Sequence, residues 1–178
     1  MLFRSYPLGL AFDGAHIWIA NFGGDTHGNS VTEVDAGSGA WVRTLSGSGY
    51  RFNEPAGIAA DGTHIWVTNP NGNSVTEIDA SNGALIRNLS GGDYGFNKPS
   101  FIAVDGTHIW ITNISGNSME ELDAGDGSLE RTLSVPSYQF DSPNSFVIAG
   151  DHAWIGNWFS RGGHGSVTEL TLASTASG

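Results

Sequence analysis

The sequence predicts an all-β fold of the β-propeller type, with four blades of about 44 residues each. A tryptophan-containing motif recurs four times, as DGAHIWIAN (13–21), DGTHIWVTN (61–69), DGTHIWITN (105–113) and AGDHAWIGN (149–157). A second motif follows each copy, as NSVTEVDA (29–36), NSVTEIDA (73–80), NSMEELDA (117–124) and GSVTELTL (165–172). Such repetition indicates one supersecondary unit stacked on its copies, because a single unit cannot bury its apolar faces. The 26 glycines also suit short strands joined by tight turns.

The second repeat shows the expected strands of one blade. PAGIAADG (55–62) is an apolar run closed by Asp-Gly, which favours a hairpin turn. HIWVTN (64–69) is apolar on both faces, so this strand should lie between two layers. NSVTEIDA (73–80) alternates more, and ALIRNLS (84–90) follows a turn as the fourth strand. The unit is therefore an antiparallel meander that grows more polar outward, as in a blade whose inner strand lines an axis.

The other repeats follow the same plan, so residues 1–178 are expected to form a single propeller domain or half-domain. The fourth strands carry an arginine at the same place, as Arg43, Arg87 and Arg131. The fourth repeat ends after GSVTELTL and has no fourth strand. The predicted blades span about 7–47, 55–91, 99–135 and 143–172, and a flexible tail is expected at 173–178.

The repeated motifs do not determine how many blades form the closed ring. Four blades could close into a tight ring within one chain, two chains could join into an eight-bladed ring, or the chain could be a piece of a longer polypeptide. An unpaired strand edge and an uncovered blade face are costly. We therefore expect a homo-oligomer, with a dimer favoured.

Charge and composition exclude several classes of partner and chemistry. Eighteen acidic residues against seven basic ones give a formal charge of −11, which disfavours nucleic acid and anionic membrane surfaces. No apolar run approaches the length of a membrane-spanning helix, and MLFRSYPLGL lacks the features of a signal peptide. The absence of cysteine excludes disulfides, thiol catalysis and thiolate metal sites.

The stretch PAGIAADGTHIWVTNPNGNSVTEIDASNGALIRNL resembles the YVTN and NHL classes of β-propeller repeat. The resemblance covers nearly the whole chain and departs at Ala149-Gly150, where the aspartate of the Asp-Gly turn is missing. Propellers of these classes include extracellular binding proteins, scaffolds, gluconolactonase-like hydrolases and streptogramin lyases. The resemblance thus implies the fold and an extracellular or cell-surface location, and it leaves the activity open.

Two loops depart from the repeat and supply a candidate site. The loops between second and third strands are short in the middle blades but long in blades one and four, as NFGGDTHGNS (21–30) and NWFSRGGHGS (157–166). A closed ring makes blade four the neighbour of a blade one, so these loops should meet. They would bring together Asp25, His27, Trp158, Arg161 and His164.

This group has two chemical interpretations besides that of ordinary polar surface loops. His27, His164 and Asp25 could hold a divalent metal ion. Alternatively, His27 or His164 could act as a base while Arg161 stabilises negative charge, and Trp158 could contact a ring of the ligand.

Other prominent polar residues recur once per blade, which indicates an architectural role. The histidines that precede the second strand should make strand-to-strand hydrogen bonds; they are His16, His64, His108 and His152. The asparagines that end this strand should bond their own loop backbone; they are Asn21, Asn69, Asn113 and Asn157. The resemblance to gluconolactonase-like propellers permits a second role for these asparagines, in binding a ligand or a metal at the axis.

The densest acidic stretch is expected to be a solvated blade edge. It comprises Glu120, Glu121, Asp123 and Asp126, and its spacing does not match a calcium-binding loop. Taken together, the sequence favours a non-enzymatic interaction or ligand-binding platform that self-associates, needs no cofactor, and binds a protein or small molecule on its loop face. The alternative is a metal-assisted lyase or hydrolase that uses a divalent ion at the loops of blades one and four.

Overall fold

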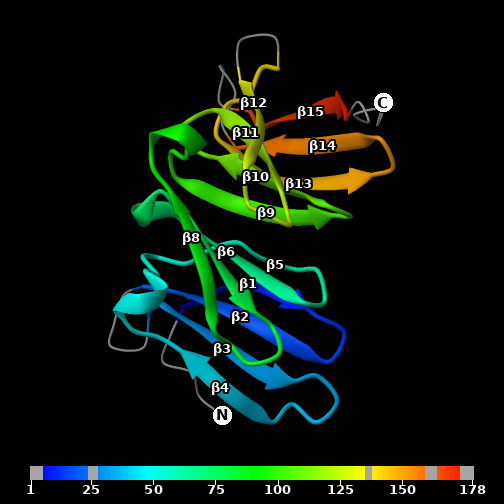
Figure 1. The fold of residues 1–178 in the computed structure, drawn as a ribbon. Coiled ribbons are helices and arrows are strands. Elements are labelled where there is room, and N and C mark those ends of the chain that lie inside the picture. Colours follow the sequence, from blue (N-terminus) through cyan, green and yellow to red (C-terminus); the bar gives the residue numbers. More distant parts are fainter. Residues whose placement is uncertain (1–5, 24–27, 135–137, 159–163, 173–178) are drawn as a thin grey trace.

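The computed structural model of the chain describes residues 6–23, 28–134, 138–158 and 164–172. Their strands form four small antiparallel sheets around a common axis, which is a four-bladed β-propeller (Figure 1). Three sheets have four strands and one has three, so the predicted fold class is confirmed. The predicted tail at 173–178 lies outside the described residues. No helix within the described ranges is long and apolar enough to cross a membrane.

Each blade is a meander that runs from its inner strand outward. Blade one contains β1 (Tyr6–Phe12), β2 (His16–Phe22), β3 (Ser30–Asp35) and β4 (Trp41–Leu45). Blade two contains β5 (Ile58–Ala60), β6 (His64–Asn69), β7 (Ser74–Asp79) and β8 (Leu85–Ser90). Blade three contains β9 (Pro99–Asp105), β10 (His108–Asn113), β11 (Ser118–Asp123) and β12 (Leu129–Ser134). Blade four contains β13 (Pro143–Ala149), β14 (His152–Asn157) and β15 (Ser166–Thr171).

The Asp-Gly turns between first and second strands form as the sequence predicts. In blade two, Gly62 has a φ of +93°, and Asp61 Oδ1 accepts hydrogen bonds from the backbone N–H groups of Thr63 and His64, both at 2.7 Å. Burial alone would raise the pKa of Asp61, but these hydrogen bonds outweigh it and lower the pKa to about 2. The ionised aspartate thus fixes the start of β6.

Adjacent blades are joined by three apolar cores, each built around a tryptophan of the second strand. Trp18 and Val31 of blade one pack with Ile65 and Ile78 of blade two. Trp66 and Trp110 take the same place in the next two cores. These three tryptophans are 0%, 0% and 2% exposed, which confirms the predicted packing between blades. The fold is therefore held by contacts that run from each blade to the next.

The segments entering blades two, three and four each add a stacked aromatic pair to these cores. Tyr50 stacks on Phe52 with ring centroids 5.2 Å apart, and the Tyr50 hydroxyl donates to the Gly83 carbonyl at 2.8 Å. The pairs that follow at the same position are Tyr94–Phe96 and Tyr138–Phe140. Each connection is thus fixed by packing as well as by chain connectivity.

The inner strands approach one another closely around the axis. β1 contacts β5, β5 contacts β9, and β9 contacts β13. A Cβ atom at Gly9 would lie 2.2 Å from the Ala56 carbonyl oxygen, and one at Gly57 would lie 2.3 Å from the Ser100 carbonyl oxygen. Glycine is therefore required where the first two inner strands meet the next blade.

Candidate functional site

The loop site predicted from the sequence falls largely outside the described residues. Asp25, His27 and Arg161 belong to the ranges that are not described. Trp158 and His164 are described, and both are exposed to solvent. The joint site of these five residues therefore stays a prediction.

The asparagines that end the second strands are buried and bind the chain segment that enters their blade. The Oδ1 atoms of Asn69, Asn113 and Asn157 each accept a hydrogen bond from a backbone N–H 16 residues earlier, at 3.3, 3.0 and 3.2 Å. The Nδ2 atom of Asn69 donates to Thr76 Oγ1 at 3.0 Å, and that of Asn157 donates to Thr168 Oγ1 at 3.0 Å.

These partners correct one sequence-based expectation. The asparagine Oδ1 atoms bind the preceding blade connection instead of the asparagine's own loop, because the connection passes beside the end of the second strand. The asparagines thus tie three segments of the chain together. A further role in ligand or metal binding stays a prediction for these four residues.

Glu120 occupies the place where the other blades have a threonine. The equivalent residues are Thr32, Thr76 and Thr168. Glu120 is fully buried, accepts a hydrogen bond from Ser118 Oγ at 2.8 Å, and pairs with Asn113 Nδ2. Burial raises the pKa of Glu120 to about 7, although both hydrogen bonds oppose this.

The predicted solvated edge at this acidic stretch is therefore wrong for two of its four residues. Glu120 and Glu121 are 0% and 5% exposed, whereas Asp126 is exposed. The reason is the alternation of β11, which lies in the interior of a four-stranded blade between two neighbouring blades. Both of its faces are consequently covered.

A histidine, a glutamate and an arginine from three adjacent strands form a network on blade one. His16 Nδ1 lies 3.4 Å from Glu33 Oε1, and Arg43 Nε lies 2.6 Å from Glu33 Oε2. Asp13 completes the group, because its Oδ2 accepts from Trp18 Nε1 at 2.7 Å and lies 3.4 Å from His16 Nδ1. The network ties the outer strand to the tryptophan core.

The same arrangement recurs in the other blades. In blade two, Glu77 lies 3.9 Å from His64 and 2.5 Å from Arg87, and in blade three Glu121 pairs with His108 and Arg131. In blade four, His152 Nδ1 lies 3.1 Å from Glu169. Each histidine thus lies 3.1–3.9 Å from a carboxylate of the neighbouring strand. The strand-to-strand hydrogen bonds expected from the sequence stay a prediction. The glutamate was missed, although it is the E of the repeated VTE or MEE motif and could have been found there.

The electrostatics of this network fit a structural link. Burial raises the pKa of Glu33 and of Glu77, and the arginine beside each partly offsets this effect. Removing an arginine would leave a buried carboxylate without its partner charge, which is strongly destabilising. The repeated arginines are therefore required by the buried glutamates.

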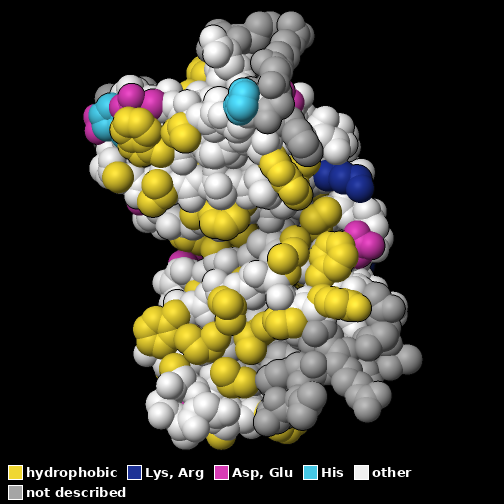
Figure 2. Space-filling view, turned by 180° about the vertical axis from the view of Figure 1, so that it is seen from behind, with side chains coloured by type: hydrophobic (Ala, Val, Ile, Leu, Met, Phe, Trp, Pro, Cys, Tyr) yellow, Lys and Arg dark blue, Asp and Glu magenta, His cyan; other side chains and the backbone are white. Residues whose placement is uncertain are grey.

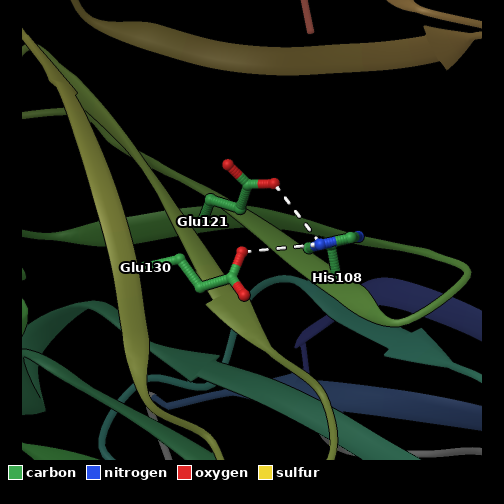
Figure 3. A group of neighbouring side chains, drawn as sticks. All are labelled: His108, Glu121 and Glu130. Atoms are coloured by element: carbon green, nitrogen blue, oxygen red, sulfur yellow. Dashed lines mark ion pairs between the residues drawn. The ribbon is translucent and has the colours of Figure 1, made fainter. Parts of the chain in front are cut away.

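Blade three adds a second glutamate to its network and provides a candidate metal centre. His108 Nε2 lies 3.5 Å from Glu130 Oε2 and 3.9 Å from Glu121 Oε1 (Figure 3). One ligand atom from each residue lies within 4.8 Å of the other two. An imidazole and two carboxylates are suitable ligands for zinc and similar divalent ions. Arg131, which is already paired with Glu121, adds a positive charge that opposes a cation here.

Cavities lie between the blades of the described structure. One of about 480 Å³ lies where the turns of blades one and two meet, and His16, His64 and Asp79 contribute to its wall. Its volume falls in the range of small-molecule sites. A second cavity of about 350 Å³ follows the axis and is lined by residues such as Leu10, Ile58, Phe101 and Asn144.

Blade four exposes the face that the other blades bury against their successor. We call this surface, formed by Val147, Trp154 and Val167, the trailing face of blade four. Trp154 is 43% exposed, whereas Trp18, Trp66 and Trp110 are nearly inaccessible. Val167 is 69% exposed, and its equivalents Val31, Val75 and Met119 are fully buried.

Blade one exposes the opposite face, which the other blades bury against their predecessor. We call this surface, formed by Leu8, Leu10 and Phe12, the leading face of blade one. Leu10 is 68% exposed, whereas its equivalents Ile58, Ile102 and Phe146 are 7%, 3% and 7% exposed. The trailing face of blade four and the leading face of blade one are thus not packed against each other.

The two faces lie at opposite ends of the molecule. Blade one forms the lower end of the ribbon and blade four the upper end (Figure 1). In the space-filling view, hydrophobic side chains lie at the surface of both halves of the molecule and across its middle (Figure 2). Exposed apolar patches of this kind mark interaction surfaces.

Comparisons with known proteins show similarity at the level of the fold. The chain is similar to virginiamycin B lyase from Staphylococcus aureus, with a TM-score of 0.73 and 17% identity over 95% of this chain and 53% of that one. It is similar to the computationally designed Ika4 protein, with a TM-score of 0.71 and 14% identity over 96% of this chain and 93% of that one. It is also similar to glutaminyl cyclase from Myxococcus xanthus, with a TM-score of 0.61 and 12% identity over 88% of this chain and 63% of that one.

These similarities show a β-propeller fold. The chain spans about half the length of the virginiamycin B lyase that it matches. No protein-family model matches the sequence, and no curated protein does. The finer resemblance to YVTN and NHL repeats therefore stays a prediction.

Proposed function

We propose that this chain is a non-enzymatic propeller module that self-associates through its two end faces and presents its loops to a protein or small-molecule ligand. The observation that carries this proposal is the exposure of Trp154 and Leu10 at positions that are buried in the other blades. Trp154 and Leu10 occupy the positions through which adjacent blades already meet three times within the chain.

The partner that fits both faces is a second copy of the chain. Blade four of one copy would pack on blade one of the other, and the reverse contact would close a ring of eight blades. Each large apolar side chain that becomes fully buried contributes about 1.5–3 kcal/mol. Because the closed pair contains two such contacts, it offsets the entropy that two chains lose on association more readily than one contact does.

Light scattering at micromolar concentration tests this proposal. We expect a mass of about twice the 18.7 kDa of one chain for the unaltered protein. Trp154→Glu places a charge on the trailing face and should reduce the mass to that of one chain. Ile86→Glu is the matched control. Ile86 is exposed like Trp154, but it lies on the outer strand β8, away from the end faces. A glutamate is compatible with this position, because blade three has Glu130 there. A single-chain mass for the unaltered protein would refute self-association.

The His108, Glu121 and Glu130 group favours a second candidate, a divalent-metal-dependent lyase or hydrolase. Its three ligand atoms are close enough to share one ion. Metal analysis of the purified protein tests it, with Glu130→Ile as the variant because blade two has Ile86 at this position. Stoichiometric metal that is lost in the variant supports the candidate. The loop residues His27 and His164 are tested in the same way by substitution with alanine.

A further inference from the structure

The edge of β15 offers a second interaction surface, which shares Val167 with the trailing face of blade four. In the described part of the chain, blade four has three strands, so β15 is the outermost. In the other blades the third strand is paired with a fourth, and Ser30, Val31 and Glu33 of blade one are almost inaccessible. Along β15, the equivalent Ser166, Val167 and Glu169 are exposed. An unpaired strand edge is a template for another strand.

The three complete blades show which strand this edge accepts. The third strand pairs with an antiparallel fourth strand in one register throughout. Its glutamate faces an arginine in the pairs Glu33–Arg43, Glu77–Arg87 and Glu121–Arg131. Its apolar residue, two positions earlier, faces a leucine in the pairs Val31–Leu45, Val75–Leu89 and Met119–Leu133. The pairing also shifts by one residue directly after each glutamate.

The charge on β15 fits the same arrangement. Glu33 and Glu77 are paired with arginine Nε at 2.6 and 2.5 Å. Glu169 instead makes an ion pair with His152 at 3.1 Å, and its side chain is 48% exposed. The guanidinium of arginine is always charged and can bind a carboxylate through two N–H groups, which an imidazole cannot do. Within the described residues, Glu169 is thus paired with His152 and not with an arginine of a fourth strand.

We propose that the edge of β15 binds an extended segment of another polypeptide that carries an arginine opposite Glu169 and an aliphatic residue opposite Val167. The segment adds a fourth antiparallel strand to blade four through main-chain hydrogen bonds. Its arginine pairs with Glu169, and its aliphatic residue, two positions later, packs beside Val167. The formal charge of −11 favours the approach of such a basic segment.

This inference goes beyond self-association, because it concerns the main-chain edge of β15, although Val167 belongs to this edge and to the trailing face. A fourth strand at β15 leaves the leading face of blade one unchanged. Light scattering reports on the contact of the end faces, whereas the experiment below reports on the backbone of β15. Failure of one proposal is therefore distinguishable from failure of the other.

The test uses the full chain and the peptide ALIRNLS, which copies residues 84–90 of the natural fourth strand. Amide hydrogen exchange is followed along 166–171 while the peptide is titrated. We expect saturable protection of the β15 amides that face away from β14. A peptide with Arg87→Glu is the matched control. Its affinity should be lower by up to about fivefold, as expected for the loss of one partly exposed ion pair.

A charge exchange separates recognition from nonspecific sticking. Glu169→Arg should weaken binding of the natural peptide and restore binding of the Arg87→Glu peptide. The exposed position of Glu169 makes this substitution compatible with folding, which circular dichroism checks. Equal binding of both peptides to both proteins overturns the proposal. Protection of these amides before any peptide is added also overturns it, because the edge would then be occupied already.

Discussion

Glu120 shows how one substitution within a repeat creates a titratable group in the interior. The other blades place a threonine hydroxyl here, and Thr76 Oγ1 contacts the Tyr50 carbonyl oxygen of the blade connection at 3.0 Å. Thr168 makes the same contact with Tyr138 at 3.2 Å. A threonine makes these bonds at any pH, whereas a carboxyl group can donate only while it is protonated.

The pH dependence of stability follows from the raised pKa of Glu120. The folded protein holds this proton up to about pH 7, and the unfolded chain releases it near 4.5. A group whose pKa is raised by folding stabilises the folded state below its unfolded pKa, and this stabilisation is lost as pH rises toward the folded pKa. We expect the free energy of unfolding of the natural protein to fall between about pH 4.5 and 7 relative to Glu120→Thr. Urea unfolding of both proteins at pH 5 and pH 8 measures the difference. A difference that is equal at both pH values contradicts the pKa assignment.

Asn69 tests the architectural role of the buried asparagines. Asn69→Ala removes the acceptor for the Asn53 N–H, whose bond is part-buried, and the donor to Thr76 Oγ1, whose bond is buried. We expect a loss of about 1–3 kcal/mol in the free energy of unfolding, because unsatisfied buried groups keep their desolvation cost. Asn71→Ala, at an exposed position in the following turn, is the control and should change stability little. Equal effects of the two substitutions would show that burial of Asn69 contributes nothing.

The strands of each blade are stabilised mainly by their neighbours, as the four tryptophans show. Trp18, Trp66 and Trp110 hold equivalent places in three cores, whereas Trp154 is 43% exposed and packs on no following blade among the described residues. How much each tryptophan contributes to stability therefore depends on whether another blade follows its own. The motif that contains the tryptophan does not decide this.

This difference predicts unequal effects of the same substitution. Trp66→Ala should destabilise the protein by about 3–5 kcal/mol, as for other large aromatic side chains removed from a core. Trp154→Ala should cost much less at high dilution, where the chain is expected to be a monomer. Thermal unfolding at low protein concentration measures both. A large effect of Trp154→Ala under these conditions would mean that blade four is covered within a single chain.

The molecule as a whole is a row of four blades around an axis with an uncovered apolar face at each end. A ring formed by two chains would bury both faces, and association then couples to folding by mass action. We expect the midpoint of thermal unfolding to rise with protein concentration for the natural chain and to be independent of concentration for Trp154→Glu. Scanning calorimetry over a hundredfold concentration range checks this. A midpoint that does not depend on concentration in either protein would contradict assembly.

Much of the blade could be predicted because it is encoded locally. Asp61-Gly62 fixes a turn by its own hydrogen bonds, and β6 is recognised by its apolar residues on both faces. Four copies of the pattern reinforce one another, so the repeat predicts the three strands that the described part of the last blade contains. The candidate site was less predictable, because residues such as Glu33 and Arg43 are brought together by strand pairing.

The sequence by itself determined the blade, its strands, its order of repeats and the tryptophan that each blade places between layers. Only the tertiary structure decided that Glu120 is buried, that the Oδ1 of Asn69 binds the connection from the preceding blade, and that Trp154 and Leu10 remain exposed. The physical reason is that turns and alternation depend on neighbours along the chain. Burial, pKa and exposure of an end face depend on which blade lies opposite, and identical motifs do not specify that.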